Sequence, residues 1–522
     1  MTIRFVCTAA QARNADSCTI EQFGVPSLVL MEHAAMAVVE EIEKMDGCGK
    51  VVVVCGPGNN GADGLAVARI LAVSGKYRVE VYCDQKRLSA DGKIHYNSLV
   101  SLSSLFSYRL SLFRIDDFEQ LNETLCEDEI LCVVDALFGT GLVRWIADPY
   151  AHLISIINEE ELPVLSIDMP SGIHTDTGEV MGCAMRAEKT ICLDCMKQGL
   201  LLGSGARHAG EIIIKDIGIP CALHEKDGSI LLLLKNWLPL LLPERSVLAN
   251  KGSFGKVLLC GGSERMQGAL SMAAKSCYHA GCGTMTLFAP APAAQAIRAK
   301  LDEAMVISAA HDDAGFFDPA AAEALKEELS AFSVAAVGNG MGTSCGAQAV
   351  LETLMKSDLP LVVDADGINI LASHPEWLNR KSPVILTPHM KEFARLCSIS
   401  MDEAITRPFE HARALIERYP AVTLVLKSSF TYIAASSPLS GISEGILHRP
   451  DAGLAKGGSG DLLCGLITGL FAQSNDPYGA GIAGSCILNQ AASLHSSPYT
   501  LTPQSLLDHI DEVFARIETG QL

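Results

Sequence analysis

The stretch VVVVCGPGNNGADGLAVARILAVSG, residues 51–75, contains the unit from which the first half of the chain is built. A β-branched run comes first, a turn of glycine and asparagine follows, and an apolar segment of helical length completes the unit. Near-continuous apolar strands that alternate with helices are typical of a parallel sheet covered on both faces. Ligands bind such sheets beyond the carboxyl ends of the strands. We therefore expect the turn at residues 55–64 to border a ligand site.

The same pattern recurs in both halves of the chain. In the first half it predicts further strands at residues 79–83, 131–135, 164–168 and 211–218. In the second half it predicts strands within residues 254–262, 334–342, 359–367, 383–389 and 423–429. Between the halves, residues 222–245 combine proline and charge without a clear period, which is typical of a boundary. We predict two different α/β domains, at residues 1–222 and 235–522, with no fixed-period repeat.

The composition narrows the classes of function. Hydrophobic residues make up 49% of the 522 residues and charged residues 19%, which is typical of a well-buried globular enzyme. The formal net charge of -20 disfavours nucleic acid as a partner, because phosphate backbones are met by clustered Lys and Arg. An anionic small molecule stays compatible, since a local nest of backbone N–H groups can hold phosphate on an acidic protein.

The apolar segments predict no membrane association. The N-terminal residues lack the apolar core of a signal peptide. The most apolar stretch, ILLLLKNWLPLLLP at residues 230–243, is interrupted by Lys235, Asn236 and Pro239 well short of the ~20 residues that a spanning helix needs. We expect a cytoplasmic protein that forms a homo-oligomer.

The 18 cysteines are scattered singly through apolar runs. A disulfide framework is expected in short secreted chains, so buried free thiols in a reducing cytoplasm are the better interpretation. Cys192 and Cys195 form one CxxC motif. Without a second pair or a histidine partner, this motif is a weak signal for a metal or redox site.

Polar residues follow three predicted strands of the first half. Asp135 ends one strand, Asp168 and Ser171 follow another, and two asparagines lie in the glycine turn at residues 55–64. A single strand-end aspartate is often a helix cap, and a glycine turn is often only a tight connection. Because the carboxyl ends of parallel strands share one edge, three polar strand ends make a common site the better interpretation.

A second glycine loop, LAKGGSGDLLCG, occupies residues 454–465. Successive backbone N–H groups at residues 457–460 can point into one concavity, and a helix that begins near Asp461 adds the positive end of its dipole. Such a nest suits a phosphoryl group in transfer, and Asp461 at its rim could deprotonate or orient the attacking hydroxyl. The structural alternative is a flexible loop with Asp461 as a helix cap.

Three motifs follow one another in the first half of the chain: CGPGNNGADG at residues 55–64, VVDALFGTGL at 133–142 and SIDMPSG at 166–172. Through these motifs, residues 1–220 resemble the NAD(P)HX epimerase family, also called the YjeF N-terminal domain. Departures from the family's pattern are Ala62, Met169, His33 and Ala35, of which His33 leaves the role of its helix open. The resemblance implies a Rossmann-like three-layer α/β sandwich that interconverts the R and S epimers of hydrated NADH or NADPH at C6.

The resemblance also implies the residues of the epimerase site. Asp168 would be the acid–base at the nicotinamide ring, where one carboxylate can move the C6 oxygen's proton both ways while the ring nitrogen assists. A potassium ion would be held by Asn60, Asp135 and Ser171. The substrate-binding residues carried over are Asn59, Asn60, Gly61, Ala62, Asp63, Gly139, Thr140, Gly141, Leu142, Val143, Arg144, Trp145 and Asp168.

The second half contains a series of motif segments at residues 261–283, 337–342, 362–369, 386–396, 424–434 and the GGSGD loop. Through these segments, residues 235–520 resemble the ADP- or ATP-dependent NAD(P)H-hydrate dehydratases of the ribokinase-like superfamily. Departures are Asn339, Met341, Met390, Lys391 and Ser428. The resemblance implies a ribokinase-like α/β domain that removes water from (S)-NAD(P)HX and releases NAD(P)H, phosphate and AMP when ADP is the donor.

The second resemblance again carries site residues. The substrate would contact Ala269, Gly340, His389 and the catalytic Asp461, and the adenine nucleotide would contact Lys427, Ser428, Ser429, Phe430, Thr431 and Gly460. A lone histidine is more often buried and hydrogen-bonded than part of a site, but His389 directly follows a predicted strand end. Mg²⁺ should accompany the nucleotide, held mostly by phosphates and water. We expect ADP, with ATP as the alternative donor.

Fused, the two domains would repair hydrated NAD(P)H completely, because one makes the epimers interchangeable and the other consumes one of them. The small molecules NAD(P)HX and ADP or ATP would be the partners. In the alternative interpretation the second half is a vitamin-precursor kinase of the hydroxymethylpyrimidine type and the first half a non-catalytic binding module. Residues 386–396 and the retained strand-end aspartates argue against this alternative.

Overall fold

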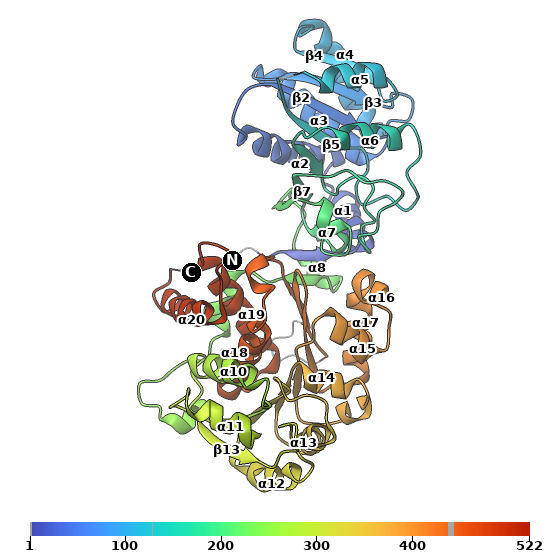
Figure 1. Ribbon diagram of the computed structural model, residues 1–522. Coiled ribbons are helices and arrows are strands. Elements are labelled where there is room, and N and C mark those ends of the chain that lie inside the picture. The colour runs from blue at the N-terminus through green and yellow to red at the C-terminus, as the bar shows by residue number, and fades with distance from the viewer. Residues whose placement is uncertain (1–2, 128, 437–442, 522) are drawn as a thin grey trace. The chain divides into compact units, whose positions relative to one another are not determined.

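The computed structural model describes residues 3–127, 129–436 and 443–521. The chain divides into two compact units, Thr2–Ile230 and Leu231–Leu522. This division lies within the interval 222–245 that the sequence marks as a boundary, while the domain limits 1–222 and 235–522 stay a prediction, with residues 1, 2 and 522 outside the described residues. Each unit is an α/β structure, as the sequence predicts (Figure 1).

The N-terminal unit is built on a seven-stranded sheet in which every pair of neighbouring strands is parallel. In spatial order its strands are β4 (Leu110–Arg114), β3 (Arg78–Cys83), β2 (Lys50–Cys55), β5 (Ile130–Ala136), β6 (Val164–Ile167), β7 (Lys189–Leu193) and β9 (Glu211–Lys215). The predicted strand at residues 211–218 thus ends three residues early, at Lys215.

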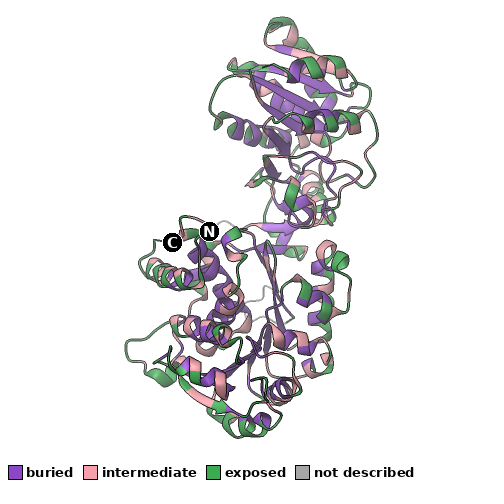
Figure 2. Cartoon of the chain, viewed as in Figure 1, coloured by how far each residue is buried: buried purple, intermediate pink, exposed green. Residues whose placement is uncertain are grey.

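Helices cover both faces of this sheet, which makes it the predicted three-layer sandwich. Successive side chains of a strand point to opposite faces of the sheet. In β2, Val51 and Val53 therefore enter the core cluster on one face, and Val52 and Val54 enter the cluster on the other. The first cluster is completed by α2 (Ser27–Glu43), α3 (Asn59–Ser74) and α4 (Ala90–Leu105), and the second by α5 (Phe118–Leu125) and α6 (Tyr150–Glu159). Figure 2 shows the buried strands between partly exposed helices.

The N-terminal unit also contains several short elements outside its seven-stranded sheet. Strand β1 (Phe5–Cys7) pairs in parallel with β8 (Met196–Lys197), with Cys7 opposite Lys197. The remaining elements are α1 (Ala9–Glu21), η1 (Gln198–Leu200), α7 (Gly205–His208) and α8 (Ala222–Lys226). The pairing brings the N-terminal strand to the segment that follows β7, almost two hundred residues later in the sequence.

The C-terminal unit contains a larger sheet. In spatial order its strands are β13 (Met305–Ala309), β12 (Thr284–Pro290), β11 (Lys256–Cys260), β14 (Val334–Val337), β15 (Leu361–Val363), β16 (Val384–Leu386), β17 (Val422–Lys427), β18 (Thr431–Ala435), β19 (Glu444–Leu447) and β10 (Ile230–Leu232). Only β18 runs antiparallel to its neighbours. The carboxyl ends of β14, β15, β16 and β17 therefore lie at one edge of the sheet.

Helices also flank this second sheet on both faces (Figure 1). One group comprises α9 (Leu238–Leu241), α10 (Gln267–His279), α11 (Ala291–Arg298), α18 (Ser459–Ser474), α19 (Pro477–Leu494) and α20 (Pro503–Glu518). The other comprises α12 (Ala321–Glu328), α13 (Cys345–Lys356), α14 (Asp366–Leu371), α15 (Met390–Cys397), α16 (Met401–Thr406) and α17 (Pro408–Arg418). Short 3-10 turns are η2 (Lys235–Trp237), η3 (Lys251–Phe254), η4 (Leu329–Ala331), η5 (Pro375–Leu378) and η6 (Ala452–Leu454).

Helix α18 is apolar over most of its length. Residues Leu462–Phe471 are buried, and the helix packs against α10 and α19 and against strands β11, β14 and β15. This packing fixes the position of its N-terminus, which carries the second glycine loop.

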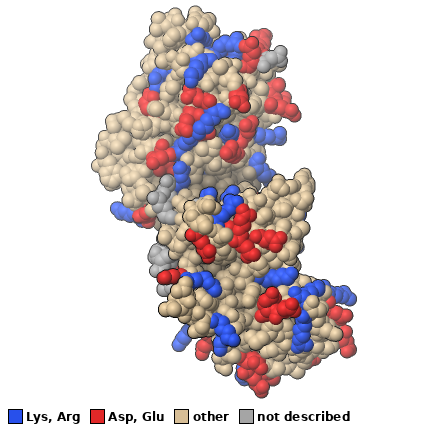
Figure 3. All heavy atoms as spheres, turned by 90° about the vertical axis from the view of Figure 1, so that its left-hand side faces the viewer, with Lys and Arg blue, Asp and Glu red and all other residues tan. Residues whose placement is uncertain are grey.

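The surface carries charges of both signs. On the face drawn in Figure 3, acidic and basic side chains are interspersed among uncharged areas. Among the described residues, no helix is both long and apolar enough to cross a bilayer.

Candidate active sites

The N-terminal unit contains a cavity of about 680 Å³. Its walls come from the turns after β2, β5 and β6, together with α1, α2 and the segment around β8. Of the predicted substrate-binding residues, those that line the cavity are Asn59, Asn60, Asp63, Gly139, Thr140, Gly141, Leu142, Val143, Arg144 and Asp168. The turns that the sequence assigns to one sheet edge do enclose one space.

Three of the predicted substrate-binding residues do not line this cavity. Ala62 is buried in the core, and the Trp145 side chain is 75% exposed. At Gly61 a Cβ would lie 1.9 Å from the Gly56 carbonyl oxygen, so this glycine lets the start of α3 approach the end of β2. The structure gives Gly61 a packing role, and a substrate contact of these three residues stays a prediction.

Asp168 lies at the carboxyl end of β6 in the left-handed backbone region, with φ of 68°. Non-glycine residues adopt this region rarely, and such positions cluster at active sites. Its Oδ1 atom accepts hydrogen bonds from the Lys197 ammonium group and from the Leu193 N–H. Among the described residues nothing donates to Oδ2. The Asp168 carboxylate therefore keeps one oxygen for a ligand.

Lys197 belongs to β8 and is buried, with only 2% of its surface exposed. Burial alone would lower the pKa of Lys197, but the Asp168 carboxylate outweighs this effect and the pKa lies above its ordinary value. The Lys197 ammonium group also donates to the Leu193 carbonyl at 2.8 Å. Lys197 is thus a fixed positive charge at the cavity wall.

Three further carboxyl groups line the same cavity, those of Asp16, Asp63 and Asp194. Burial and the Asp168 charge raise the pKa of Asp63 well above its ordinary value. The same two causes, with the charge of Asp194 added, raise the pKa of Asp16. Among the acids of the cavity wall, Asp168 pairs with Lys197 and Asp194 pairs with His224.

Behind the cavity wall, Asp135 is completely buried and accepts four hydrogen bonds. Ser171 donates from its hydroxyl at 2.5 Å and from its N–H at 2.8 Å, Ser166 donates at 2.8 Å, and the Leu137 N–H donates at 3.3 Å. Burial raises the pKa of Asp135 in spite of these donors. No Lys, Arg or His of the described residues forms an ion pair with it.

Asn60, the third residue predicted to hold a cation, lies beside the same group. An added Cβ at Gly139 would be 3.2 Å from Asn60 Oδ1, and Ser171 accepts a hydrogen bond from the Phe138 N–H at 2.9 Å. The Asn60 Nδ2 atom is buried and has no hydrogen-bond partner in the described structure. Asn60, Asp135 and Ser171 thus approach the loop at residues 138–139, and their oxygen atoms are ligands of the type that hard cations take.

In the C-terminal unit, α18 begins at Ser459, two residues before the predicted start. Its N-cap is Gly458, with φ of 102°, and no side chain caps it. The backbone N–H groups of Gly460 and Asp461 have no intramolecular acceptor among the described residues. An added Cβ at Gly460 would lie 3.4 Å from Lys427 Nζ. Free N–H groups at a helix start beside an ammonium group form an anion-binding site.

A chain of polar side chains links this helix start to the sheet edge. Asn339 donates through Nδ2 to Asp461 at 2.8 Å and to Asp364 at 3.1 Å. Asp364 in turn accepts hydrogen bonds from Lys427 at 2.9 Å and from Thr387 at 2.7 Å. The residue after Asp364, Ala365, has φ of 48°, which is an uncommon conformation for alanine.

Burial and nearby charges shift the pKa values of the polar side chains that link α18 to the sheet edge. Burial raises the pKa of Asp461 to about 6, the hydrogen bond from Asn339 opposes the rise, and the charge of Asp364 adds to it. Burial alone would lower the pKa of Lys427, but the Asp364 carboxylate outweighs this effect and raises it. Asp461 can therefore exchange a proton near neutral pH.

The other residues predicted to bind the dehydratase substrate lie next to these linked polar side chains. Gly340 has φ of 65°, and an added Cβ would lie 2.6 Å from the Met266 carbonyl oxygen and 3.1 Å from the Ala269 Cβ. His389 caps α15, where its Nδ1 accepts hydrogen bonds from two N–H groups, and its backbone bridges to Lys427. The His389 side chain is 52% exposed, so it is a surface cap rather than a buried histidine.

Of the predicted nucleotide-binding residues, Lys427–Thr431 occupy the hairpin between β17 and β18, and Gly460 belongs to α18. Lys427 pairs with Thr431 across this hairpin, and Ser428 and Ser429 are exposed at its tip. The Phe430 ring is buried against Phe409, with 5.7 Å between the ring centroids. A nucleotide contact of these residues stays a prediction.

Sequence reasoning missed three residues of these two sites. Lys197 follows the CxxC motif on a two-residue strand and carries no motif of its own. Asp364 directly follows β15 and could have been found as a strand-end aspartate, as Asp135 and Asp168 were. Asn339 was noted only as a departure from a family pattern, yet it is the residue that joins Asp461 to Asp364.

Comparison with known families gives two matches along the chain. Residues 27–199 match the family described as YjeF-related protein N-terminus. Residues 257–512 match the family described as NAD(P)H-hydrate dehydratase. The first match contains the cavity with Asp168, and the second contains Asp461 with its polar chain.

Relatives match both units together. The chain is similar to the bifunctional NAD(P)H-hydrate repair enzyme of Salinibacter ruber, with 34% identity over 98% of this chain and 96% of the relative. It is also similar to the enzyme of the same name from Coxiella burnetii, with 33% identity over 92% of this chain and 93% of that relative. Among solved structures, the ADP/ATP-dependent NAD(P)H-hydrate dehydratase from Bacillus subtilis matches 55% of this chain and 98% of its own, with 25% identity and a TM-score of 0.47.

Proposed function

Because the chain belongs to the family of bifunctional NAD(P)H-hydrate repair enzymes, we propose that its two units catalyse two successive steps at the residues described above. The enzyme is an epimerase and a dehydratase of hydrated NAD(P)H, joined in one chain. The N-terminal unit interconverts the R and S epimers, and the C-terminal unit removes water from one of them. The observation that carries the assignment of sites is that each unit contains a cavity-facing or helix-end aspartate, Asp168 or Asp461, in a network built around it.

In the epimerase step, Asp168 moves the proton of the C6 oxygen. Its Oδ1 is held by Lys197 and Leu193, so Oδ2 is the atom that gives a proton to the C6 oxygen and later takes one back. The protonated oxygen leaves as water while the ring nitrogen supplies its lone pair, and water then adds to the other face of the ring as Oδ2 takes up the released proton. Lys197 fixes the orientation of the carboxylate throughout.

A potassium ion fits the group formed by Asn60, Asp135 and Ser171. The observation that supports it is a fully buried carboxyl, Asp135, without a cationic partner in the described structure. When bound, the ion supplies positive charge that fixes the loop at residues 138–139 at the cavity wall. Epimerase activity should require potassium and should fall in Asp135→Asn. Full activity in a potassium-free choline buffer would contradict this assignment.

In the dehydratase step, Asp461 takes the proton of the C6 hydroxyl as that oxygen attacks the terminal phosphoryl group of the nucleotide. The free N–H groups of Gly460 and Asp461 and the Lys427 ammonium group stabilise the charge on the phosphoryl oxygens. The phosphorylated C6 oxygen then leaves as phosphate, the ring nitrogen assists, and loss of the C5 proton restores the double bond. With ADP as donor, the products are NAD(P)H, phosphate and AMP.

Mg²⁺ bound with the nucleotide would neutralise charge on the phosphates at this site. The donor set fits an ion held mostly by phosphate and water. Asp364 is already paired with Lys427, and Asp366 accepts a hydrogen bond from the Gly342 N–H at 2.9 Å. We propose ADP as the donor, with ATP as the alternative.

The experiment that tests this function mixes the purified chain with both NADHX epimers and follows the absorbance of NADH. ADP and ATP are supplied in separate reactions, each with Mg²⁺. Complete conversion to NADH with stoichiometric phosphate is expected with the preferred donor. A stable phosphorylated product without NADH would instead favour the vitamin-precursor kinase, and conversion that stops at one epimer in the wild-type chain would remove the epimerase step.

A further inference from the structure

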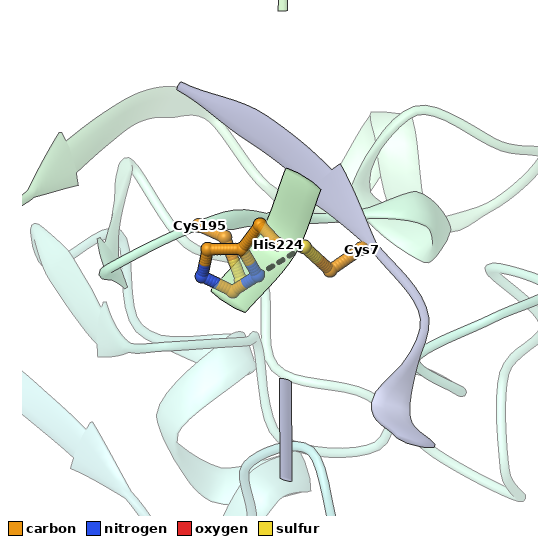
Figure 4. A group of neighbouring side chains, drawn as sticks. All are labelled: Cys7, Cys195 and His224. Atoms are coloured by element: carbon orange, nitrogen blue, oxygen red, sulfur yellow. Dashed lines mark hydrogen bonds between the residues drawn. The ribbon is translucent and has the colours of Figure 1, made fainter. Parts of the chain in front are cut away.

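Two cysteines and a histidine from distant parts of the sequence meet in the N-terminal unit. Cys7 ends β1, Cys195 lies in the turn between β7 and β8, and His224 belongs to α8. Their ligand atoms all lie within 4.8 Å of one another, and all three residues are buried. Figure 4 shows the three side chains pointing toward a common centre. Among the described residues this is the one group of His, Cys, Asp and Glu so arranged.

A carboxylate fixes the orientation of the histidine. His224 Nε2 lies 2.6 Å from Asp194 Oδ2, and His224 Nδ1 lies 3.4 Å from Cys7 Sγ. The Asp194 contact favours the tautomer with the proton on Nε2, which leaves the lone pair of Nδ1 directed at the cysteines. Histidines that bind metals commonly donate their other ring N–H to a carboxylate in this way.

We propose that Cys7, Cys195 and His224 bind one Zn²⁺ ion, with water in the fourth position. Thiolate sulfur and imidazole nitrogen are the ligands that zinc prefers, and it takes four of them in a tetrahedron. On binding, the two thiols lose their protons to solvent and His224 coordinates as the neutral imidazole. Two thiolates and one Zn²⁺ carry no net charge together, so the assembly can stay buried.

These three ligands are not the pair of cysteines that the CxxC motif in the sequence suggests. Cys192 completes the CxxC motif with Cys195, but it lies within β7 and is not part of the group. The histidine partner that the motif lacks in the sequence is His224, 29 positions after Cys195. Zinc would join β1 and α8 to the turn that leads into β8, and β8 carries Lys197.

The first test uses the complete chain, stripped of metal and reduced without oxygen. Titration with Co²⁺ should give a thiolate-to-cobalt charge-transfer band that saturates at one ion per chain, and Zn²⁺ should abolish it. Cys7→Ser, Cys195→Ser and His224→Ala should each weaken Zn²⁺ binding by at least ~100-fold, measured by competition with a chromophoric chelator. Cys192→Ser is the matched control, because it removes a buried thiol of the same motif and should bind Zn²⁺ as the wild type does.

A milder variant keeps the test valid if a ligand variant does not fold. Asp194→Asn should retain one Zn²⁺ per chain but with affinity lowered about 10–100-fold, as is usual when the carboxylate behind a ligating histidine is lost. The absence of a charge-transfer band in the wild-type chain would overturn the proposal. Equal losses of Zn²⁺ affinity in Cys192→Ser and Cys195→Ser would also overturn it. So would a Cys7–Cys195 disulfide, detected by mass in the purified protein before reduction.

Discussion

At the scale of single residues, environment separates acids that share a chemical type. Asp168 is paired with Lys197, Asp135 is surrounded by four donors, and Asp461 shares the amide of Asn339 with Asp364. Burial brings the pKa of Asp461 to about 6, where a carboxyl can both take and hold a proton near neutrality. The role proposed for Asp461 therefore has a direct consequence for pH dependence.

We expect the rate of dehydration to rise with pH through about 6, because Asp461 acts as a base only when ionised. Asp461→Asn should lower this rate by about 10²–10⁴-fold and remove its rise with pH, which is the acidic limb of the pH–rate profile. The rate of epimerisation should stay unchanged. The pH–rate profile with a saturating nucleotide and the S epimer measures both effects.

Asn339→Ala tests the cause of the same pKa. The hydrogen bond from Asn339 lowers the pKa of Asp461, so its loss should move the acidic limb to higher pH by roughly one unit. Gln348→Ala is the control, because Gln348 is a surface amide that donates to the Thr343 carbonyl of its own segment. A limb that stays in place in Asn339→Ala would contradict the role of this hydrogen bond.

At the scale of elements, the proposed catalytic residues lie at the ends of strands and helices, and tightly packed turns fix the positions of these ends. The β2–α3 turn depends on close approach, since an added Cβ at Gly61 would collide with the Gly56 carbonyl. At Gly58, in the same turn, an added Cβ would meet nothing within 4 Å. Strand β8 similarly presents Lys197 from a pairing of only two residues.

Gly61→Ala should destabilise the N-terminal unit by about 1–3 kcal/mol or more, because backbone must shift to admit the methyl group. Gly58→Ala, with φ of -90° in the wild type, should have little effect on stability. Thermal unfolding of both variants provides the measurement. Equal stability of the two would contradict the packing role assigned to Gly61.

Lys197→Met should destabilise the same unit by about 3–5 kcal/mol, since it leaves the buried Asp168 carboxylate unpaired. Lys189→Met is the control. Lys189 lies 3.8 Å from Glu211, whose side chain is 65% exposed, and such surface pairs contribute about 0–1 kcal/mol. Denaturant unfolding of the two variants should separate them clearly, and a Lys197→Met chain as stable as Lys189→Met would refute a buried ion pair.

The elements also show which parts of the fold and of the sites can be predicted from the sequence. Alternating strands and helices predict both α/β units, and the rule that parallel strands share an edge predicts that Asp135 and Ser171 approach each other. Lys197 could not be found this way, because its place depends on the pairing of β8 with the N-terminal strand. Nor could the contact of Cys7 with His224, which are 217 positions apart and belong to no common motif.

At the scale of the whole molecule, the relatives that match nearly the full chain assign both reactions to one polypeptide. The two proposed sites contain separate acids, in units that each have their own core. Neither reaction alone repairs all of a damaged cofactor, because the dehydratase consumes one epimer and the epimerase forms no NAD(P)H. The central claim is therefore a division of labour between Asp168 and Asp461.

The most direct test follows NADH formation from an equal mixture of the two epimers by the Asp168→Asn chain, with donor and Mg²⁺ in excess. Asn tolerates the left-handed backbone that Asp168 adopts, so this substitution removes the acid–base without straining the turn. From the pure S epimer, the variant should be as fast as the wild type. From the mixture, it should convert about half rapidly and then continue only at the spontaneous rate of epimerisation, and added Asp461→Asn chain should restore full conversion. Complete conversion of the mixture by Asp168→Asn alone, at the wild-type rate, would contradict the account.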